Sequence, residues 1–410
     1  MKHRIKSSSG FISIFWTGLK ALLNLPIYWI SLIVPKKEYL WVFGAWFGER
    51  YSDNSKYLFE YVNSHHPEIK AYWLSNSKDV VSLVRSKGYK SLNTKSLKGY
   101  LISIKAKYAF LTSSIRDINP YTIGGTQIIQ LWHGIPLKKI FFDDAITFGR
   151  MPVWEKIMLM IFPFYKKNYD YSKHYFVVNS LKEKEIISSA FNMPKERILI
   201  TGSPRLDSMV LNKENVPIIQ NIRKLKEKKQ IVALYAPTHR QQGINRTTFL
   251  HEDLERLQHI LKSKNINLFI NLHFYHKERE NEAVFSNIHF MKNTEIEGDI
   301  YVVLNEFDVL ITDYSSIYFD FLIMDKPIIF YPYDLEEYTK KDRKFYFSYD
   351  EVTPGPKVQS LSEMAEMIYK QYHEDLYKRE RERIRNTFLN FIDGNNSERL
   401  CVEILEGQLG

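Results

Sequence analysis

The sequence predicts an α/β protein built from two doubly wound units, preceded by a separate helical segment. Three observations predict this fold class. The 410 residues exceed what one ordinary core accommodates, since about 150 residues per domain is typical. Apolar, β-prone runs alternate with helical patterns along most of the chain, as in parallel sheets covered by helices. Hydrophobic residues make up 44% and charged residues 25%, which is a globular composition and not that of a disordered chain.

Residues 1–36 form a basic and then apolar segment. Basic residues dominate positions 2–6 and precede an apolar run, 11–35, which Lys20 and Pro26 interrupt. No small-residue cleavage site follows, so a removable signal peptide is not expected. The run reaches the ~20 residues that a bilayer span needs, but the charge of Lys20 disfavours a clean span. We expect a helix that lies in the membrane interface and is held by anionic lipid. A spanning helix and a helix packed on the protein's own core are the alternatives.

Residues 37–215 are expected to form the first α/β unit. Short apolar runs rich in β-branched and aromatic residues alternate there with amphipathic stretches. Strands are expected at 39–46, 69–75, 107–113, 126–132, 174–180 and from 197, and helices at 55–66, 154–165 and 181–191.

Residues 216–410 are expected to form the second unit, whose first strand comes directly after the lysine-rich stretch 223–230. The segment 307–334 has the clearest pattern, with a strand, a loop, a helix, a turn and a strand in close succession. Further strands are expected at 231–237 and 267–274, a helix at 250–264, and a largely helical tail at 361–406.

The carboxyl ends of the strands are where doubly wound sheets bind ligands. His133 follows the expected strand 126–132, Gly134 lets the backbone turn sharply or approach a ligand, and Pro136 prevents the strand from continuing. A histidine in that place can accept a proton near neutral pH. The alternative is a hydrogen-bonded histidine that closes the strand without any chemistry.

A second histidine, His273, also follows an apolar run, and His276 and Lys277 come shortly after it. Two histidines three residues apart could begin a metal site. No third histidine or carboxylate completes a recognisable ligand pattern, so we expect no metal.

The strongest local signal is the sequence around Asp313. This aspartate ends a strand, and Ser315 with Ser316 opens a helix, so that hydroxyls and free backbone N–H groups converge. Such a place can bind phosphate. Plain capping of the helix by serine is the alternative and requires no ligand.

Two further strand ends carry basic residues. Arg205 follows a strand and a glycine turn in "TGSPRLD", where we expect it to be exposed and able to bind an anion through two hydrogen bonds. Thr238 and Arg240 occupy the corresponding place in "YAPTHR" of the second unit. The alternative for each arginine is an ordinary surface residue.

Composition and missing motifs exclude several classes of protein. The formal net charge of +10 favours anionic partners. The single cysteine, Cys401, excludes an intramolecular disulfide framework and fits a reducing cytoplasm. No GxxxxGK[ST] loop, no helix-opening GxGxxG and no GxSxG elbow occurs, which counts against kinases, nicotinamide dehydrogenases and α/β-hydrolases.

Taken together, the motifs resemble those of the CDP-glycerol glycerophosphotransferase family, which builds teichoic acids and capsule polymers. The motifs that carry this resemblance are "LWHGIPLKKI", "TGSPRLD", "YAPTHR", "ITDYSSIYFDFLIMDKP" and "DGNNSER", in this order between about residues 39 and 399. The resemblance implies a GT-B fold, meaning two Rossmann-like domains facing across a cleft. It also implies no obligatory metal, no cofactor and a membrane-associated N-terminus.

The resemblance also implies roles for individual residues. His133 matches the histidine assigned as the base that deprotonates the acceptor hydroxyl, and His273 matches one that helps to hold the donor's phosphates. Family members commonly have His-Pro where this chain has His273-Phe274. The candidate substrate-binding residues are Gly134, Lys138, Arg205, Thr238, Arg240, Lys277, Asp313, Ser315, Ser316 and Arg399.

The expected activity is transfer of glycerol phosphate from CDP-glycerol to a hydroxyl of a membrane-linked acceptor, with release of CMP. The acceptor is a lipid-linked or saccharide molecule, and the enzyme is expected on the cytoplasmic face of a bacterial membrane. An aligned base and fixed positive charge suffice for such chemistry. Three alternatives remain: CDP-ribitol as the donor, a GT-B enzyme acting on a nucleotide sugar, and a basic binding protein without turnover. Nucleic acid is not an expected partner, because the histidines and serines lie at strand ends and not in a basic stripe.

Overall fold

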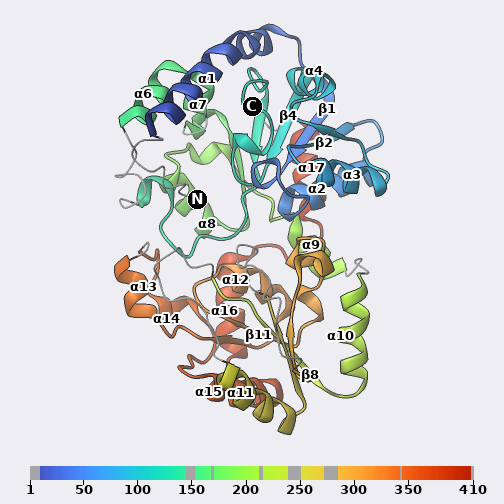
Figure 1. Cartoon of the computed structure of the whole chain (residues 1–410), viewed down its shortest axis with the longest axis vertical. Helices are drawn as coiled ribbons and strands as arrows, with labels where there is room; N and C mark the ends of the chain where they lie inside the picture. The colour runs from blue at the N-terminus through green and yellow to red at the C-terminus, as the bar shows by residue number, and fades with distance from the viewer. Residues whose placement is uncertain are drawn as a thin grey trace.

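The computed structural model describes residues 10–144, 153–167, 170–211, 216–238, 251–271, 285–341 and 344–407. These residues form two parallel sheets, one of seven strands and one of five, each flanked by helices. The two sheets lie in different halves of the molecule, the first in the upper half of Figure 1 and the second in the lower half. The predicted α/β class with parallel sheets is therefore confirmed.

The first sheet has the order β3-β2-β1-β4-β5-β6-β7 and the second the order β10-β9-β8-β11-β12. The strands of the first sheet are β1 (Lys37–Gly44), β2 (Lys70–Ser75), β3 (Ser91–Asn93), β4 (Ala106–Leu111), β5 (Gln127–Gln130), β6 (Tyr175–Val178) and β7 (Ile198–Ile200). Those of the second are β8 (Ile231–Tyr235), β9 (Ile266–Ile270), β10 (Ile288–Phe290), β11 (Val309–Thr312) and β12 (Ile328–Phe330).

Helices cover both sheets, as the alternating sequence pattern predicts. In the first half they are α1 (Gly10–Ile33), α2 (Asp53–His65), α3 (Lys78–Ser86), α4 (Leu97–Lys105), α6 (Val153–Ile161), α7 (Pro163–Lys167), α8 (Leu181–Ala190) and α9 (Arg205–Leu211). In the second half they are α10 (Pro217–Glu227), α11 (His251–Ser263), α12 (Ile317–Phe321), α13 (Leu335–Lys341), α14 (Tyr349–Val352), α15 (Leu361–Glu374) and α16 (Lys378–Phe388). The helix α17 (Asn396–Leu405) returns to the first half.

Strands buried on both faces explain why the sequence pattern is so clear in the centre of each sheet. All five residues of β8 are buried, as are all four of β11, so each reads as a continuous apolar run and not as an alternation. The edge strands β3 and β10 have only three residues each, and only one residue of each is fully buried. Too few apolar residues mark these edge strands for the sequence pattern to predict them.

The hydrophobic cores do not follow the order of the chain. Leu400, Cys401 and Ile404 of α17 are buried in the core of the first sheet, although they belong to the last helix. In the opposite direction, Ile135 and Leu137, which follow β5, are buried in a core of the second half. The predicted division at residue 215 remains a prediction.

The helix α1 is packed against the first half on one side. Ala21 and Tyr28 form a small apolar core with Phe162 and Phe164, which lie in and beside the short helices α6 and α7 (Figure 1). Lys36 holds the carboxyl end of α1, since its Nζ atom donates to the carbonyl of Ser31 at 2.8 Å and to that of Ile104 at 2.6 Å. Within the described part of the chain, the apolar helices are too short or too weakly apolar to cross a membrane.

Each sheet contains one point where the strand order reverses. The reversal lies between β1 and β4 in the first sheet and between β8 and β11 in the second. Ligands of doubly wound sheets bind outside the carboxyl ends of the strands at such points. The loops after β1, β4 and β5 and those after β8 and β11 are therefore where a functional site is expected.

Candidate active site

The His133 turn, residues 131–134, follows β5 at the carboxyl edge of the first sheet. Trp132 has a φ of 56°, a left-handed conformation that is uncommon for a large aromatic residue, and Gly134 has a φ of 154°. This sharp change of direction takes the chain out of the first sheet. The imidazole of His133 is half-buried beside the loops that follow β1 and β4.

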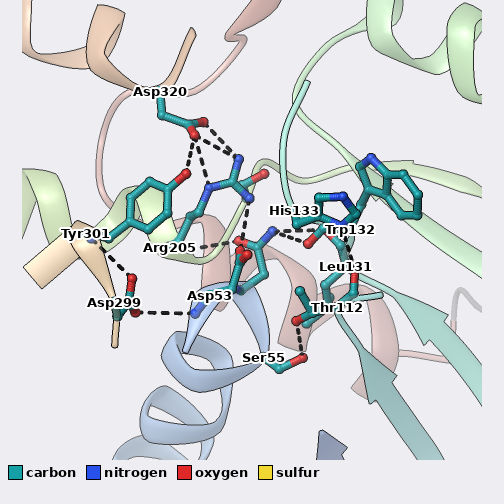
Figure 2. Close-up of polar contacts among 12 residues, drawn as sticks. Asp53, Ser55, Thr112, Leu131, Trp132, His133, Arg205, Asp299, Tyr301 and Asp320 are labelled. Atoms are coloured by element: carbon teal, nitrogen blue, oxygen red, sulfur yellow. Dashed lines mark hydrogen bonds and ion pairs between the residues drawn. The ribbon is translucent and has the colours of Figure 1, made fainter. Parts of the chain in front are cut away.

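His133 is held in an orientation that suits a base. Its Nδ1 atom lies 3.2 Å from the carbonyl oxygen of Thr112, the residue after β4 (Figure 2). Because a carbonyl oxygen only accepts hydrogen bonds, Nδ1 carries the proton in the neutral ring and Nε2 carries the lone pair. Trp46, in the loop after β1, places its ring 5.2 Å from the imidazole. The side chain is thus fixed on two sides, with Nε2 as the atom able to accept a proton.

Asp117 shapes the two loops that flank His133. Its carboxylate accepts the backbone N–H of Phe47 at 2.7 Å, in the loop that carries Trp46, and that of Thr112 at 2.9 Å and of Ser113 at 2.6 Å, in the other loop. Burial raises the pKa of Asp117 to about 7, and these N–H donors oppose the rise. One buried carboxyl group thereby fixes both loops around the histidine.

The Asp313–Ser316 turn follows β11 in the second sheet. Asp313 is fully buried, and its Oδ1 atom accepts the backbone N–H of Thr238 at 2.8 Å and the hydroxyl of Thr238 at 2.6 Å. This pair joins the loop after β8 to the loop after β11. Asp313 and Thr238 therefore lie together and hold the backbone of the turn, and substrate binding by either residue remains a prediction.

Ser315 and Ser316 are half-buried at the outer end of the same turn. The helix that follows, α12, has only five residues, so the electrostatic contribution expected from a long helix is small. The side chain of Ser316 makes no capping hydrogen bond to α12, whereas the Oγ atom of Ser315 accepts the backbone N–H of Ile317, the first residue of α12, at 3.5 Å. The hydroxyl of Ser316 lies beside Gly134 of the His133 turn.

The His133 turn and the Asp313–Ser316 turn meet. A Cβ atom placed on Gly134 would lie only 2.6 Å from the Oγ atom of Ser316 and 3.3 Å from its Cβ atom. A side chain at position 134 would push the Ser316 hydroxyl away, and residues other than glycine rarely adopt its φ of 154°, so both observations favour glycine here. The candidate base and the predicted anion site therefore share one location.

Lys138 contributes to the junction between the halves. Its Nζ atom donates to the hydroxyl of Tyr338 at 3.0 Å, and its backbone forms an antiparallel bridge with Phe345. The next residue extends this junction, since the N–H of Lys139 donates to the carbonyl of Lys344 at 2.7 Å. These contacts fix the segment after His133 on the second half, and substrate binding by Lys138 remains a prediction.

The prediction that Arg205 is exposed is wrong. The side chain is fully buried, and its guanidinium binds Asp320 through Nη2 at 2.9 Å and Asp53 through Nη1 at 3.5 Å (Figure 2). Tyr301 donates its hydroxyl to the same Asp320 carboxylate at 2.5 Å. Burial raises the pKa of Asp53 to about 6, while the adjacent Arg205 lowers it. The arginine neutralises buried carboxylates from both halves, so its guanidinium is not available to an external anion.

Arg399 also binds partners within the chain. Its guanidinium donates to both oxygens of Asp393, at 2.8 and 2.9 Å, and its Nε atom donates to the carbonyl of Thr201 at 3.2 Å. Close by, Asp207 accepts the backbone N–H of Asn396 at 2.9 Å. The "TGSPRLD" and "DGNNSER" motifs thus bind each other and fix α17, and donor binding by Arg399 remains a prediction.

Three predicted site residues, His273, Lys277 and Arg240, lie outside the described residues, and their roles remain predictions. The structure adds residues that the sequence did not single out, namely Trp46, Thr112 and Asp117. Trp46 follows β1, so the strand-end rule could have found it. Thr112 acts through its backbone carbonyl, and the carboxylate of Asp117 accepts backbone N–H groups, and the sequence carries no signal for either contact.

The chain is similar to known proteins over most of its length. The model of the family described as CDP-Glycerol:Poly(glycerophosphate) glycerophosphotransferase matches residues 27–406. The teichoic acid glycerol-phosphate transferase of Staphylococcus aureus (strain NCTC 8325 / PS 47) is 28% identical over 402 residues, which cover 95% of this chain and 99% of that protein.

Two further comparisons concern a longer relative and a solved structure. The teichoic acid poly(glycerol phosphate) polymerase of Bacillus subtilis (strain 168) is 30% identical over 83% of this chain, which spans only 45% of that protein. The solved structure of the wall teichoic acid polymerase TagF superposes with a TM-score of 0.75 over 97% of this chain and 99% of that chain. At 24% sequence identity this likeness shows a shared fold.

Proposed function

Because the chain belongs to the CDP-glycerol:poly(glycerophosphate) glycerophosphotransferase family, we propose that it transfers glycerol phosphate from CDP-glycerol to a hydroxyl of a membrane-linked acceptor and releases CMP. The observation that carries this proposal is the approach of Gly134, next to His133, to the hydroxyl of Ser316. A proton acceptor from the first half and a predicted phosphate site from the second thus lie on two turns that meet at Gly134 and Ser316. Teichoic acid or capsule polymer is the product in this proposal.

In this proposal the reaction is a single nucleophilic displacement at phosphorus. The acceptor hydroxyl gives its proton to Nε2 of His133 while its oxygen attacks the phosphorus that carries glycerol. The bond from that phosphorus to the bridging oxygen of the pyrophosphate breaks, and CMP leaves with the bond electrons. Alignment of the hydroxyl by His133 and stabilisation of the leaving phosphate by the second half supply the catalysis.

The two halves have different tasks in this proposal. Residues 37–215 bind the acceptor and carry the base, and residues 216–410 bind the CDP-glycerol. Ser316 contributes a hydroxyl to the donor phosphates, and the predicted contributions of His273, Lys277 and Arg240 belong to the same side. Asp313 and Thr238 act by holding the turn that presents Ser316.

Substitution of His133 by alanine tests the proposal. Purified wild-type protein should release CMP from CDP-glycerol in the presence of a lipid-linked acceptor, and His133→Ala should lower kcat by at least about 100-fold, as is typical for loss of a general base. His259→Ala, on the exposed face of α11, is the matched control and should retain normal turnover. If the protein released CMP from CDP-ribitol but not from CDP-glycerol, the donor would be CDP-ribitol. Turnover of a UDP-sugar would make a nucleotide sugar the donor. Normal turnover by His133→Ala would remove the base from the mechanism.

We further propose that the exposed apolar side chains of α1 and α6 dock the enzyme on the cytoplasmic face of the membrane. Beyond the side of α1 that packs on the protein, Trp16, Leu23 and Trp29 are 61%, 68% and 55% exposed, and Met160 of α6 is 87% exposed. Figure 1 places these two helices together at the end of the first half. An in-plane apolar surface with a basic flank binds anionic lipid. The basic residues at positions 2–6 lie outside the described residues.

Sedimentation with lipid vesicles tests this docking surface. The wild-type protein should sediment with vesicles containing phosphatidylglycerol, and the double variant Leu23→Ser/Met160→Ser should sediment markedly less. Leu376→Ser is the control, because Leu376 is 57% exposed but belongs to the second half. Equal sedimentation of all three proteins would contradict the assignment of α1 and α6 as the docking surface.

A further inference from the structure

Asn54 lies directly behind the His133 turn. It is the second residue of α2 and is fully buried. Its Nδ2 atom donates to the carbonyl of Leu131 at 3.0 Å and to that of Trp132 at 2.9 Å. Its Oδ1 atom accepts the backbone N–H of Arg205 at 3.0 Å. Both amide hydrogens of Asn54 are therefore used on the two residues that immediately precede the histidine.

The His133 turn needs such a partner. Trp132 is held at a φ of 56°, a left-handed conformation that is unfavourable for a residue other than glycine. The carbonyls of Leu131 and Trp132 lie beyond the end of β5, where the ladder of the sheet no longer supplies donors. By donating to both, Asn54 stabilises the left-handed turn against relaxation into an extended conformation.

The same asparagine connects the turn to the second half of the molecule. The backbone N–H of Arg205 donates to Asn54, and the guanidinium of Arg205 binds Asp320 in α12. Asp320 lies four residues after Ser316 in the same turn-and-helix segment. A continuous set of buried hydrogen bonds thus runs from the Leu131 carbonyl through Asn54 and Arg205 to α12. Figure 2 shows its two ends, Leu131 and Asp320, with Arg205 between them.

We propose that Asn54 is a positioning residue, which fixes the Leu131 and Trp132 carbonyls and thereby holds the imidazole of His133 in line with the acceptor hydroxyl. This inference rests on the proposed role of His133 as the base. Asn54 itself touches no reacting atom. A misplacement of a catalytic group by about 1 Å can cost roughly 100-fold in rate, so loss of the two hydrogen bonds should act mainly on kcat.

Substitution of Asn54 by serine tests the inference. The shorter, uncharged side chain removes both hydrogen bonds to the carbonyls of Leu131 and Trp132. We expect kcat to fall by about 100-fold and the KM for CDP-glycerol to change by less than about threefold, since the donor side is untouched. Asn287→Ser is the matched control, because Asn287 is also buried and donates to a backbone carbonyl, that of Ile266 at 2.9 Å, in the second sheet.

A double-mutant cycle separates positioning from a general loss of structure. If Asn54 acts through His133, then Asn54→Ser should lower the residual activity of His133→Ala by less than about threefold, because the group it positions is already absent. An equal fold-loss in both backgrounds would show a general structural role and overturn the inference. Wild-type kcat in Asn54→Ser would overturn it as well.

A second variant and a second measurement complete the test. Asn54→Asp keeps an acceptor for the N–H of Arg205 but lacks the two donors, so it should reproduce the loss of kcat if the donors are what matters. Hydrogen exchange of backbone amides in 131–137 should be faster in either Asn54 variant than in Asn287→Ser, and this readout does not depend on activity. Unchanged exchange there would overturn the inference. Absence of CMP release by the wild-type protein would instead overturn the proposed function alone.

Discussion

The Arg205 turn, residues 201–207, and the Asp313–Ser316 turn look alike in sequence and differ in the structure. Each follows a strand, β7 or β11, and each carries polar residues suited to an anion. Arg205 is nevertheless fully buried and bound to Asp320 and Asp53, whereas Ser316 is half-buried and faces Gly134 across the junction of the halves. The rule that ligands bind at the carboxyl ends of parallel strands thus locates a turn. Carboxylates on neighbouring elements decide whether a basic side chain in that turn binds within the protein or can bind a ligand.

The largest difference between the two turns is expected in the free energy of unfolding, which Arg205→Met should lower. Removal of the guanidinium leaves Asp320 and Asp53 buried without a counter-charge, and breaking such a buried pair costs about 3–5 kcal/mol. Urea unfolding should show this loss of stability. Lys87→Met is the control, because the Lys87–Glu297 pair is 30% exposed on both sides and should contribute about 1 kcal/mol or less. A stable Arg205→Met protein with weakened donor binding would restore Arg205 as an anion-binding residue.

Ser316→Ala is expected to have a smaller effect, and on donor binding instead of on stability. Because this hydroxyl does not cap α12, the free energy of unfolding should change by less than about 0.5 kcal/mol. The KM for CDP-glycerol should rise about tenfold, as for loss of one hydrogen bond to a charged group. Ser263→Ala, on the surface of α11, is the control and should alter neither quantity. A loss of stability with an unchanged KM would make Ser316 a structural residue and erase the contrast with Arg205.

Much of the candidate site could be predicted because it depends on local rules. His133, Gly134, Thr238 and Asp313 follow strands whose apolar runs are evident in the sequence, and the ends of parallel strands share one edge of a sheet. The pairing of Thr238 with Asp313 follows from β8 and β11 being neighbours in the second sheet. These relations need only the positions of the strands.

The rest depends on partners that are distant in the sequence. The burial of Arg205 follows from Asp53 and Asp320, which are 152 and 115 residues away. Asn54 is 77 residues from the Leu131 carbonyl that it binds. Neither relation has a local pattern, because a buried asparagine or aspartate that binds backbone groups can belong to any helix start. Such residues become visible only when the fold brings the elements together.

The position of α17 has a consequence for how the protein is made. Leu400, Cys401 and Ile404 fill part of the core beneath Trp41 and Phe110 of the first sheet. A nascent chain that has emerged only as far as residue 215 therefore leaves the part of this core that α17 fills exposed to solvent. The half that is synthesised first can complete its core only after α17 has been synthesised, so the loops around His133 reach their final packing only after the second half has left the ribosome.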